Sequence, residues 1–381
     1  YLNSTIMPAS SESRIIYTLS RNLSWNFAGQ ILAKFSLLLF HILFANLVGA
    51  KGYGEFSLVF VAGVIILQPS LDMGLNQLIT KWINRGNIEV IRNSFQIKSR
   101  VSVVLLPLVI LLGWWYGIHP ILLGTILIYF LINTIQQSLF GILRGLEDLR
   151  PESITVALQN LLALTVLWIF SNHEINEPWV GSLVLMLTRC AGTILVTGII
   201  WKKYLLKLNN YEHSKTLQST SNLWQEALTL GLVLFLIQFY FRIDTIMLGL
   251  LSSKTEVGLY SVAFNLMEGT FFIPSIVMAV IFPGLSQTKQ FLNYFRKGLL
   301  LLSLTGIACG GAVFLLAEII FQMFFAQEFQ GSGEVLKILA LAIPIIFWGY
   351  LMTQSLVALD HNRIYLGITA FAVLLNVLLN Y

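Results

Sequence analysis

Charged side chains occur deep inside the apolar stretches of this 381-residue chain. Lys34, Arg189 and Arg242 each lie well within such a stretch. A charged group inside a membrane is costly, so it usually faces a water-filled cavity or an opposite charge. Guanidinium and ammonium groups also bind phosphate oxygens well. These residues therefore predict a cationic cavity for an anionic substrate. The alternative interpretation is a set of structural ion pairs between helices, such as Arg242 with Glu268.

Three carboxylates share this apolar setting and are candidates for ion coupling. Asp72, Asp244 and Glu268 lie within the apolar stretches, where a carboxylate can bind a proton or a sodium ion. The alternative for each is a structural partner. Arg242 and Asp244 are separated by one residue and point to different sides of a straight helix, so they are not expected to pair. No cofactor is expected apart from a coupling proton or sodium ion, and no spacing typical of a metal site occurs.

Two prolines at related places are candidate hinges. Pro69 and Pro274 lie inside apolar stretches, where a proline removes a backbone hydrogen bond and permits a kink. A kink of this kind can bend during gating or can be static, and the sequence leaves both interpretations open.

Uncharged polar groups also interrupt the apolar stretches. Asn133, Gln136 and Gln137 form a polar patch that could line a cavity or hold helices together by hydrogen bonds. For His41 we favour a role in helix packing.

The elements that carry these groups follow from the composition. Hydrophobic residues make up 56% of the chain, charged residues only 11%, and the mean hydropathy is +0.78. Soluble domains contain about 25% charged residues. The sequence therefore predicts an all-α, polytopic membrane protein. The net charge of +5 does not indicate nucleic-acid binding, because Lys and Arg lie in short loops between apolar stretches.

Eleven apolar segments approach the length of roughly 20 residues that spans a bilayer. Their approximate ranges are 24–48, 56–80, 101–117, 119–143, 153–171, 179–201, 226–250, 257–283, 298–317, 335–358 and 364–381. The chain begins at Tyr1 and the last segment reaches Tyr381 without a polar end, so we expect a longer protein of twelve or more helices. No P-loop, G-x-S-x-G or HExxH motif occurs, which argues against an ATP-driven pump or a hydrolase of those kinds.

The distribution of basic residues predicts the orientation. Most of the 23 Lys and Arg residues fall in alternate loops, on the same side as the N-terminus. Lys51, Lys254 and Lys337 are the exceptions on the other side. Short basic loops stay cytoplasmic, so we expect a cytoplasmic N-terminus.

A repeated motif predicts two related halves. Residues 54–60 read GEFSLVF and residues 258–264 read GLYSVAF, and both open the second helix of a half. LRGLEDLR at 143–150 similarly matches LVALDHNR at 356–363. Parallel repeats of this kind are typical of alternating-access transporters, although chance similarity of apolar helices is the alternative. We predict an N-terminal lobe over 1–215 and a C-terminal lobe over 216–381, around a central cavity.

Two stretches resemble a known family. Residues 25–82 read WNFAGQILAKFSLLLFHILFANLVGAKGYGEFSLVFVAGVIILQPSLDMGLNQLITKW. This stretch resembles the opening of oligosaccharide and polysaccharide flippases, such as O-antigen flippases. These flippases belong to the multidrug/oligosaccharidyl-lipid/polysaccharide (MOP) exporter superfamily. FRIDTIMLGLLSSKTEVGLYSVAFNLMEG, at 241–269, resembles their seventh and eighth helices, with Asp244 at a characteristic position.

The resemblance implies two lobes of twelve to fourteen helices in total around a cationic cavity, which would suit Lys34, Arg189 and Arg242. It implies outward transfer of a polyprenyl-pyrophosphate-linked oligosaccharide across a prokaryotic plasma membrane, without enzymatic chemistry. Membrane lipid and polysaccharide-assembly proteins are the implied partners. Lys34 and Arg189 match no fixed position of the family. The alternatives are a drug/cation antiporter of the same superfamily and, from another class, a membrane-embedded glycan polymerase or ligase.

Overall fold

The computed structural model describes residues 11–171, 177–209, 220–287, 290–359 and 361–380, and these ranges contain helices but no strand. The helices are α1 (Ser11–Asp72), α2 (Leu75–Asn84), α3 (Glu89–Trp115), α4 (Pro120–Gly145), α5 (Arg150–Phe170), α6 (Pro178–Asn209), α7 (Thr220–Leu251), α8 (Lys254–Glu268), α9 (Phe272–Leu285), α10 (Phe291–Phe324), α11 (Gly331–Ala358) and α12 (Asn362–Asn380), with the 3₁₀ turns η2 (Gly269–Phe271) and η3 (Gln327–Phe329).

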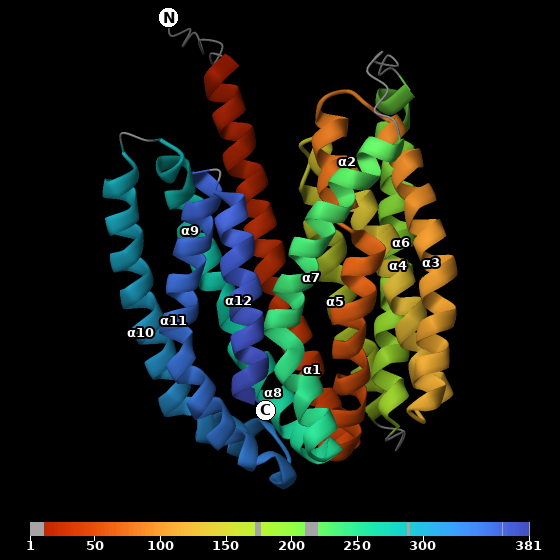
Figure 1. Cartoon of the computed structure of the whole chain (residues 1–381), viewed down its shortest axis with the longest axis vertical. Coiled ribbons are helices and arrows are strands. Elements are labelled where there is room, and N and C mark those ends of the chain that lie inside the picture. The colour runs from red at the N-terminus through yellow and green to blue at the C-terminus, as the bar shows by residue number, and fades with distance from the viewer. Residues whose placement is uncertain (1–10, 172–176, 210–219, 288–289, 360, 381) are drawn as a thin grey trace, which may run out of the picture.

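Each of the eleven predicted segments corresponds to helix in this structure. The first segment and most of the second are joined in α1, which reverses direction at Gly49, where φ is 73° and ψ is 172° (Figure 1). The second segment, predicted at 56–80, is interrupted at Met73 and Gly74 and continues into α2. The eighth segment comprises α8, η2 and α9. By length and apolar composition, nine spans of the described residues could cross a membrane. This number is below eleven because the two legs of α1 count as one span and 364–380 is shorter than the other spans. The prediction of an all-α polytopic membrane protein is confirmed.

The outer surface of the bundle is apolar, as a lipid-facing surface must be. Val103, Leu315 and Ile338 expose 71%, 75% and 70% of their area, and many other large apolar side chains are exposed. Soluble proteins do not carry apolar surface on this scale. The lipid bilayer is therefore the solvent that these side chains require.

One boundary prediction is wrong in an informative way. The segment predicted at 101–117 is helix α3 from Glu89 to Trp115, so Arg92, Lys98 and Arg100 belong to the helix and not to a loop. Lys98 is only 4% exposed. The hydropathy pattern misplaced the helix start because the first turns of α3 pack on neighbouring helices, so polar residues are tolerated there.

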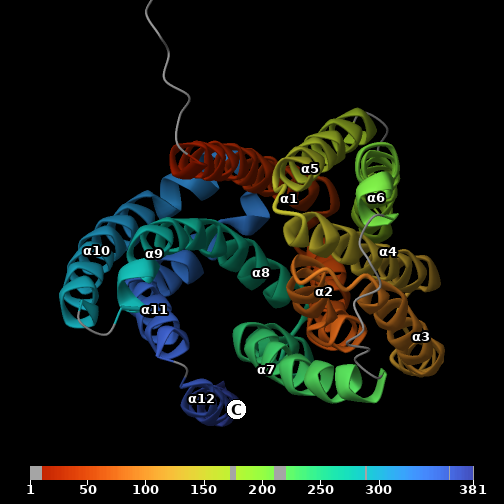
Figure 2. The ribbon, with the colours of Figure 1, turned by 90° about the horizontal axis from the view of Figure 1, so that it is seen from above.

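The helices form two groups, with α1 and α7 running between them. Figure 2 shows α2 to α6 on one side and α8 to α12 on the other. Helix α1 packs on α5 and α8, and α7 packs on α1 and α12. The predicted boundary at 215/216 lies outside the described residues, so the division at that position stays a prediction.

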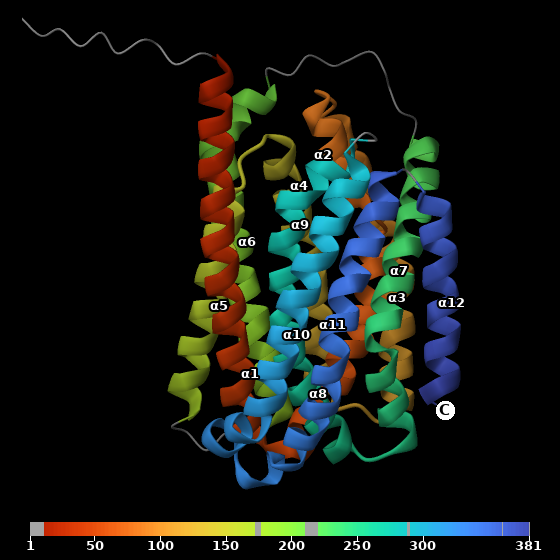
Figure 3. The same cartoon turned by 90° about the vertical axis from the view of Figure 1, so that its left-hand side faces the viewer.

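Loops lie at the two ends of the long axis of the bundle (Figures 1 and 3). We call the end with the connections 85–88 and 146–149 the basic end, and the end with the turns at Gly49 and 252–253 the opposite end. At the opposite end the two copies of the repeated motif meet. A Cβ atom on Gly54 would lie 1.7 Å from the carbonyl oxygen of Lys254, and one on Gly258 would lie 2.0 Å from that of Ala50. Glycine at both motif positions therefore allows the two backbones to touch.

Both candidate hinge prolines lie beside interruptions of a helix. Pro69 precedes the end of α1, which is followed by Met73 and Gly74 with φ of 47° and 71°. Pro274 lies in the first turn of α9, directly after η2. Short 3₁₀ turns inside helices often mark hinges. The structure places the prolines where bending would occur, and their movement stays a prediction.

Candidate functional site

A cavity of about 300 Å³ lies between α1, α4, α6, α7 and α8, and we call it the central cavity. The three predicted cations all line it, although they come from three helices far apart in sequence. Glu268 also lines it. The full lining consists of Lys34, Leu37, Leu38, His41, Tyr53, Phe56, Ser57, Phe60, Val61, Val64, Gln68, Tyr129, Phe130, Leu185, Arg189, Arg242, Ser261, Asn265, Glu268 and Gly269.

Arg242 has an acidic partner in this wall. Its Nη2 atom donates a hydrogen bond to Oε2 of Glu268 at 2.5 Å, between α7 and α8. Its guanidinium carbon also lies 4.8 Å from the centre of the Phe264 ring, a cation–π distance. The structural ion pair considered from the sequence is therefore present. It lies on the cavity surface, where the Glu268 side chain is 43% exposed.

Arg189 is held by neutral groups. Its Nη1 atom donates to Oε1 of Gln136 at 2.9 Å, and Nη2 donates to the Tyr129 hydroxyl at 2.8 Å. The amide of Gln136 in turn donates to Oε1 of Gln159 at 3.0 Å. Gln136 thus links α4, α5 and α6 and fixes the guanidinium. Because no acid takes part in these contacts, the positive charge of Arg189 is oriented without being neutralised.

Lys34 is an exposed residue of the cavity wall on the first leg of α1. Among the residues that the structure describes, its ammonium group has no hydrogen-bond or ion-pair partner. Glu268 attracts it electrostatically without pairing with it. Three cations therefore share one carboxylate, and the central cavity carries a net positive charge.

The repeated motif supplies matching faces of the cavity. Ser57 and Ser261 occupy the same place in the two copies, and both line the cavity. One helical turn later, Asn265 donates from Nδ2 to the Tyr53 hydroxyl at 2.8 Å, and that hydroxyl lies 2.9 Å from Nδ1 of His41. Sequence reasoning missed Tyr53 and Asn265. The spacing of Asn265 from Ser261, one turn along the same helix, was the signal that could have found it.

The three candidate coupling carboxylates do not share a site. Glu268 lines the central cavity, whereas Asp244 accepts a hydrogen bond from the Tyr260 hydroxyl and does not line the cavity. Asp72 lies in a separate buried cluster, 3.6 Å from Nζ of Lys98. No group of three or more His, Cys, Asp or Glu that could hold a metal ion occurs in the described part of the chain.

Comparisons with known proteins agree with this architecture. The family model described as polysaccharide biosynthesis protein matches residues 19–289, and the MatE model matches residues 230–381. A search of curated proteins found no match. An inward-facing multidrug resistance transporter of the MATE family, in the MOP superfamily, shares 16% identity over 90% of this chain and 84% of that chain, with a TM-score of 0.69.

A eukaryotic MATE transporter, AtDTX14, shares 12% identity over 89% of this chain and 82% of that chain, with a TM-score of 0.52. At these identities the two structures show a common fold and no more. The polysaccharide biosynthesis model covers most of the chain, and its match agrees with the resemblance seen in the sequence. The chain belongs to the polysaccharide biosynthesis protein family, and its fold is shared with transporters of the MATE family.

Proposed function

We propose that this protein moves a polyprenyl-pyrophosphate-linked oligosaccharide across a prokaryotic plasma membrane by alternating access. The observation that carries the proposal is the wall of the central cavity, where Lys34, Arg189 and Arg242 gather against the single acid Glu268. A pyrophosphate group needs several basic donors, and guanidinium groups match its oxygens well.

Each cation can contribute in a different way. Lys34 and Arg189 offer positive charges that no acid neutralises, so pyrophosphate binding there displaces no ion pair. Arg242 must exchange Glu268 for phosphate, which couples substrate binding to the contact between α7 and α8. Oγ of Ser261 has no hydrogen-bond partner among the described residues but is buried, so it would meet a sugar hydroxyl only after the wall of the cavity opens.

A second cavity suits the lipid tail. It has a volume of about 750 Å³ and lies where the end of α1, α3 and α7 meet, and its lining residues are Ser70, Ile97, Arg100, Val101, Val104, Leu105, Leu108 and Trp224. Most of these side chains are apolar, so a polyprenyl chain would bind there by the hydrophobic effect. Arg100 would lie near the charged headgroups.

The positive-inside rule places the basic end in the cytoplasm, and with it the N-terminus. The opposite end then faces outward and is closed by the contact of Gly54 with Gly258 and by the hydrogen bond from Asn46 to the carbonyl oxygen of Phe324 at 2.7 Å. This arrangement suits loading from the cytoplasm, and the structural neighbour described as inward-facing is consistent with it. Release requires these contacts to separate.

The test is translocation in proteoliposomes of a fluorescent polyprenyl-pyrophosphate sugar, whose leaflet is read by quenching with a membrane-impermeant reagent. We expect the wild type to flip the probe and the double variant K34Q/R189Q to lose this activity. The matched control K337Q changes a lysine at the opposite end that pairs with Glu318 and Glu334. Equal flipping by the double variant and the control would refute the proposal.

A MATE-like antiporter for drugs or other cations is the second candidate, favoured by the MatE match over 230–381. It would rely on Glu268 to bind a cation, so E268Q should abolish its transport, whereas a pyrophosphate flippase should tolerate this change. An assay of cation efflux beside the flipping assay separates the two candidates.

A glycan polymerase or ligase draws less support from the opposite end. In the sequence, the acidic residues expected at that end are Glu174, Glu177, Glu318 and Glu328, and they form no obvious catalytic constellation. Glu174 lies outside the described residues. Glu318 pairs with Lys337, and the Glu328 carboxylate packs against Gly49. Both carboxylates therefore make contacts that suit a structural role.

A further inference from the structure

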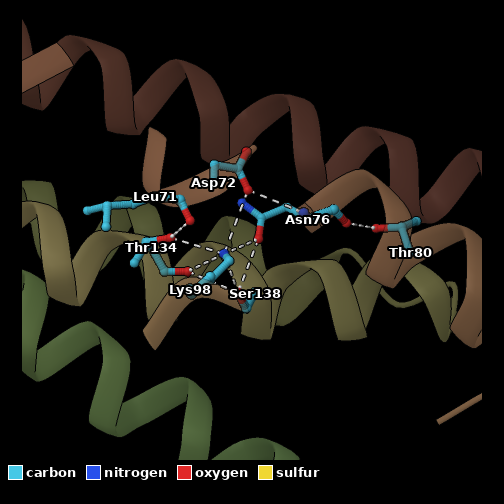
Figure 4. A network of polar contacts seen from close by, with 7 residues as sticks. All are labelled: Leu71, Asp72, Asn76, Thr80, Lys98, Thr134 and Ser138. Carbon is cyan, nitrogen blue, oxygen red and sulfur yellow. Dashed lines mark hydrogen bonds and ion pairs between the residues drawn. The ribbon is translucent and has the colours of Figure 1, made fainter. Parts of the chain in front are cut away.

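A buried ammonium group lies inside a cage of oxygen atoms in the N-terminal part of the bundle, away from the central cavity. Nζ of Lys98 donates to Oγ of Ser138 at 2.7 Å and to Oδ1 of Asn76 at 2.9 Å. It also lies 3.0 Å from Oγ1 and 3.2 Å from the carbonyl oxygen of Thr134. Oδ1 of Asp72 is 3.6 Å away. We call these four residues around Lys98 the Lys98 cage (Figure 4).

The cage is built at a break in the helix. Asp72 ends α1, Asn76 lies in the first turn of α2, and Met73 and Gly74 between the two helices have positive φ. The break is braced by Asp72, which accepts a hydrogen bond from the backbone N–H of Asn76 at 3.2 Å. Figure 4 shows the ends of α1 and α2 facing the side chains from α4 across the ammonium group.

The oxygen atoms outnumber what an ammonium group needs. An ammonium group has three N–H donors, yet five oxygens converge on Nζ of Lys98. A carboxylate, an amide carbonyl, a backbone carbonyl and two hydroxyls are the hard oxygen ligands that bind Na⁺ and similar ions. Broken helices are also where transporters commonly bind such ions. The geometry is therefore that of a cation site whose centre is filled by a side chain.

We propose that the cage is a monovalent-cation site that Lys98 occupies as a covalently attached cation. The ammonium group holds the break between α1 and α2 against α3 and α4, and no free sodium ion binds or exchanges there. Lys98 and Ser138 are 4% and 0% exposed, so a soluble ion cannot compete without opening the lobe. Asp72 is then committed to Lys98. Any ion coupling in the described part of the chain falls to Glu268 or Asp244.

The test is the sodium dependence of thermal unfolding of the full chain in detergent, compared between sodium chloride and choline chloride at equal ionic strength. The wild type should unfold at the same temperature in both salts. K98A, which empties the centre of the cage, should be less stable in choline. Sodium should then raise its midpoint in a saturable way, by at least about 2 °C.

Two matched variants separate a specific site from a general salt effect. K98M fills the space without a charge, so sodium should not stabilise it. D72N/K98A lacks the carboxylate, so the stabilisation by sodium should be lost. A K98A protein that responds equally to sodium and choline, or that fails to fold even when prepared in sodium, would overturn the proposal.

Radioactive sodium binding tests the same proposal without changing Lys98. Lys98 fills the cage in the wild type, so sodium should not bind there. Any sodium that the wild type binds elsewhere should therefore be bound equally by S138A. Sodium binding that S138A abolishes would show that the cage accepts a free ion beside Lys98, which contradicts the proposal.

Discussion

Lys34 and Lys98 are the same residue type in two regions of one membrane protein, and their surroundings are opposite. Lys34 is exposed to the central cavity and has no paired acid in the described structure. Lys98 is 4% exposed and donates to oxygens of Asn76, Thr134 and Ser138. The free donors of Lys34 are available to a substrate, whereas the donors of Lys98 are already used to hold helices together. The number of partners separates the two roles better than position along the helix does.

Packing explains the difference. Helix α3 packs on α2 and α4, so the side of α3 that carries Lys98 faces the interior of one lobe. The first leg of α1 carries Lys34 along the space between the two groups of helices, where the cavity lies. Buried charges are destabilising unless they are paired and hydrogen-bonded. The comparison therefore predicts that changes in the Lys98 cage act on stability and changes in the central cavity act on binding.

The largest effect is expected from K98M. Removing the ammonium group leaves Asp72 and the cage oxygens buried without their donor, which should lower the free energy of unfolding by about 3–5 kcal/mol. The measurement is thermal or denaturant unfolding in detergent. The matched variant K34M should change stability by less than about 0.5 kcal/mol, because Lys34 has no partner to lose. Equal losses in both variants would break the distinction between the two lysines.

A smaller effect is expected from K34Q and R189Q, and for K34Q on binding alone. Each loses a charge-assisted contact with the substrate, worth about 1.5–3 kcal/mol, so affinity for a polyprenyl pyrophosphate should fall roughly 10- to 150-fold per variant. Calorimetric titration in detergent measures this. S138A is the control, since it alters the Lys98 cage and should leave the affinity unchanged. Undiminished binding by both cavity variants would remove Lys34 and Arg189 from the site.

E268Q tests whether the one acid of the central cavity restrains its cations. Neutralising Glu268 frees Arg242, so affinity for the pyrophosphate should rise about fivefold, the value of one hydrogen bond of about 1 kcal/mol. E268D preserves the charge and should bind as the wild type does. A loss of binding in E268Q would instead assign Glu268 a direct contact with the substrate.

The smallest effect is expected from the exposed ion pair at the opposite end. Nζ of Lys254 lies 2.9 Å from Oε2 of Glu55, and the lysine side chain is 50% exposed. Such pairs contribute about 0.2–1 kcal/mol to stability. A double-mutant cycle with E55Q and K254Q gives the coupling energy. A coupling as large as the loss in K98M would show that burial is not what distinguishes the Lys98 cage.

The sequence alone determined the class of fold and the inventory of charges. Eleven apolar segments predicted eleven helical segments, because crossing a bilayer demands long runs of apolar side chains whatever the tertiary packing. The same argument identified Lys34, Arg189 and Arg242 as unusual, since charges are rare inside such runs. The repeated motif further predicted two related halves, and its glycines Gly54 and Gly258 meet in the structure.

Only the tertiary structure decided which charges meet. The sequence placed Lys98 in a loop and grouped Asp72 with Asp244 and Glu268, and neither the cage nor its separation from the central cavity was visible. Hydropathy reports how apolar a stretch is on average. It does not report which face of a helix meets lipid, a cavity or another helix. Lys34, Arg189 and Arg242 line one cavity because helices far apart in sequence pack around it. That packing is fixed only when the whole bundle folds.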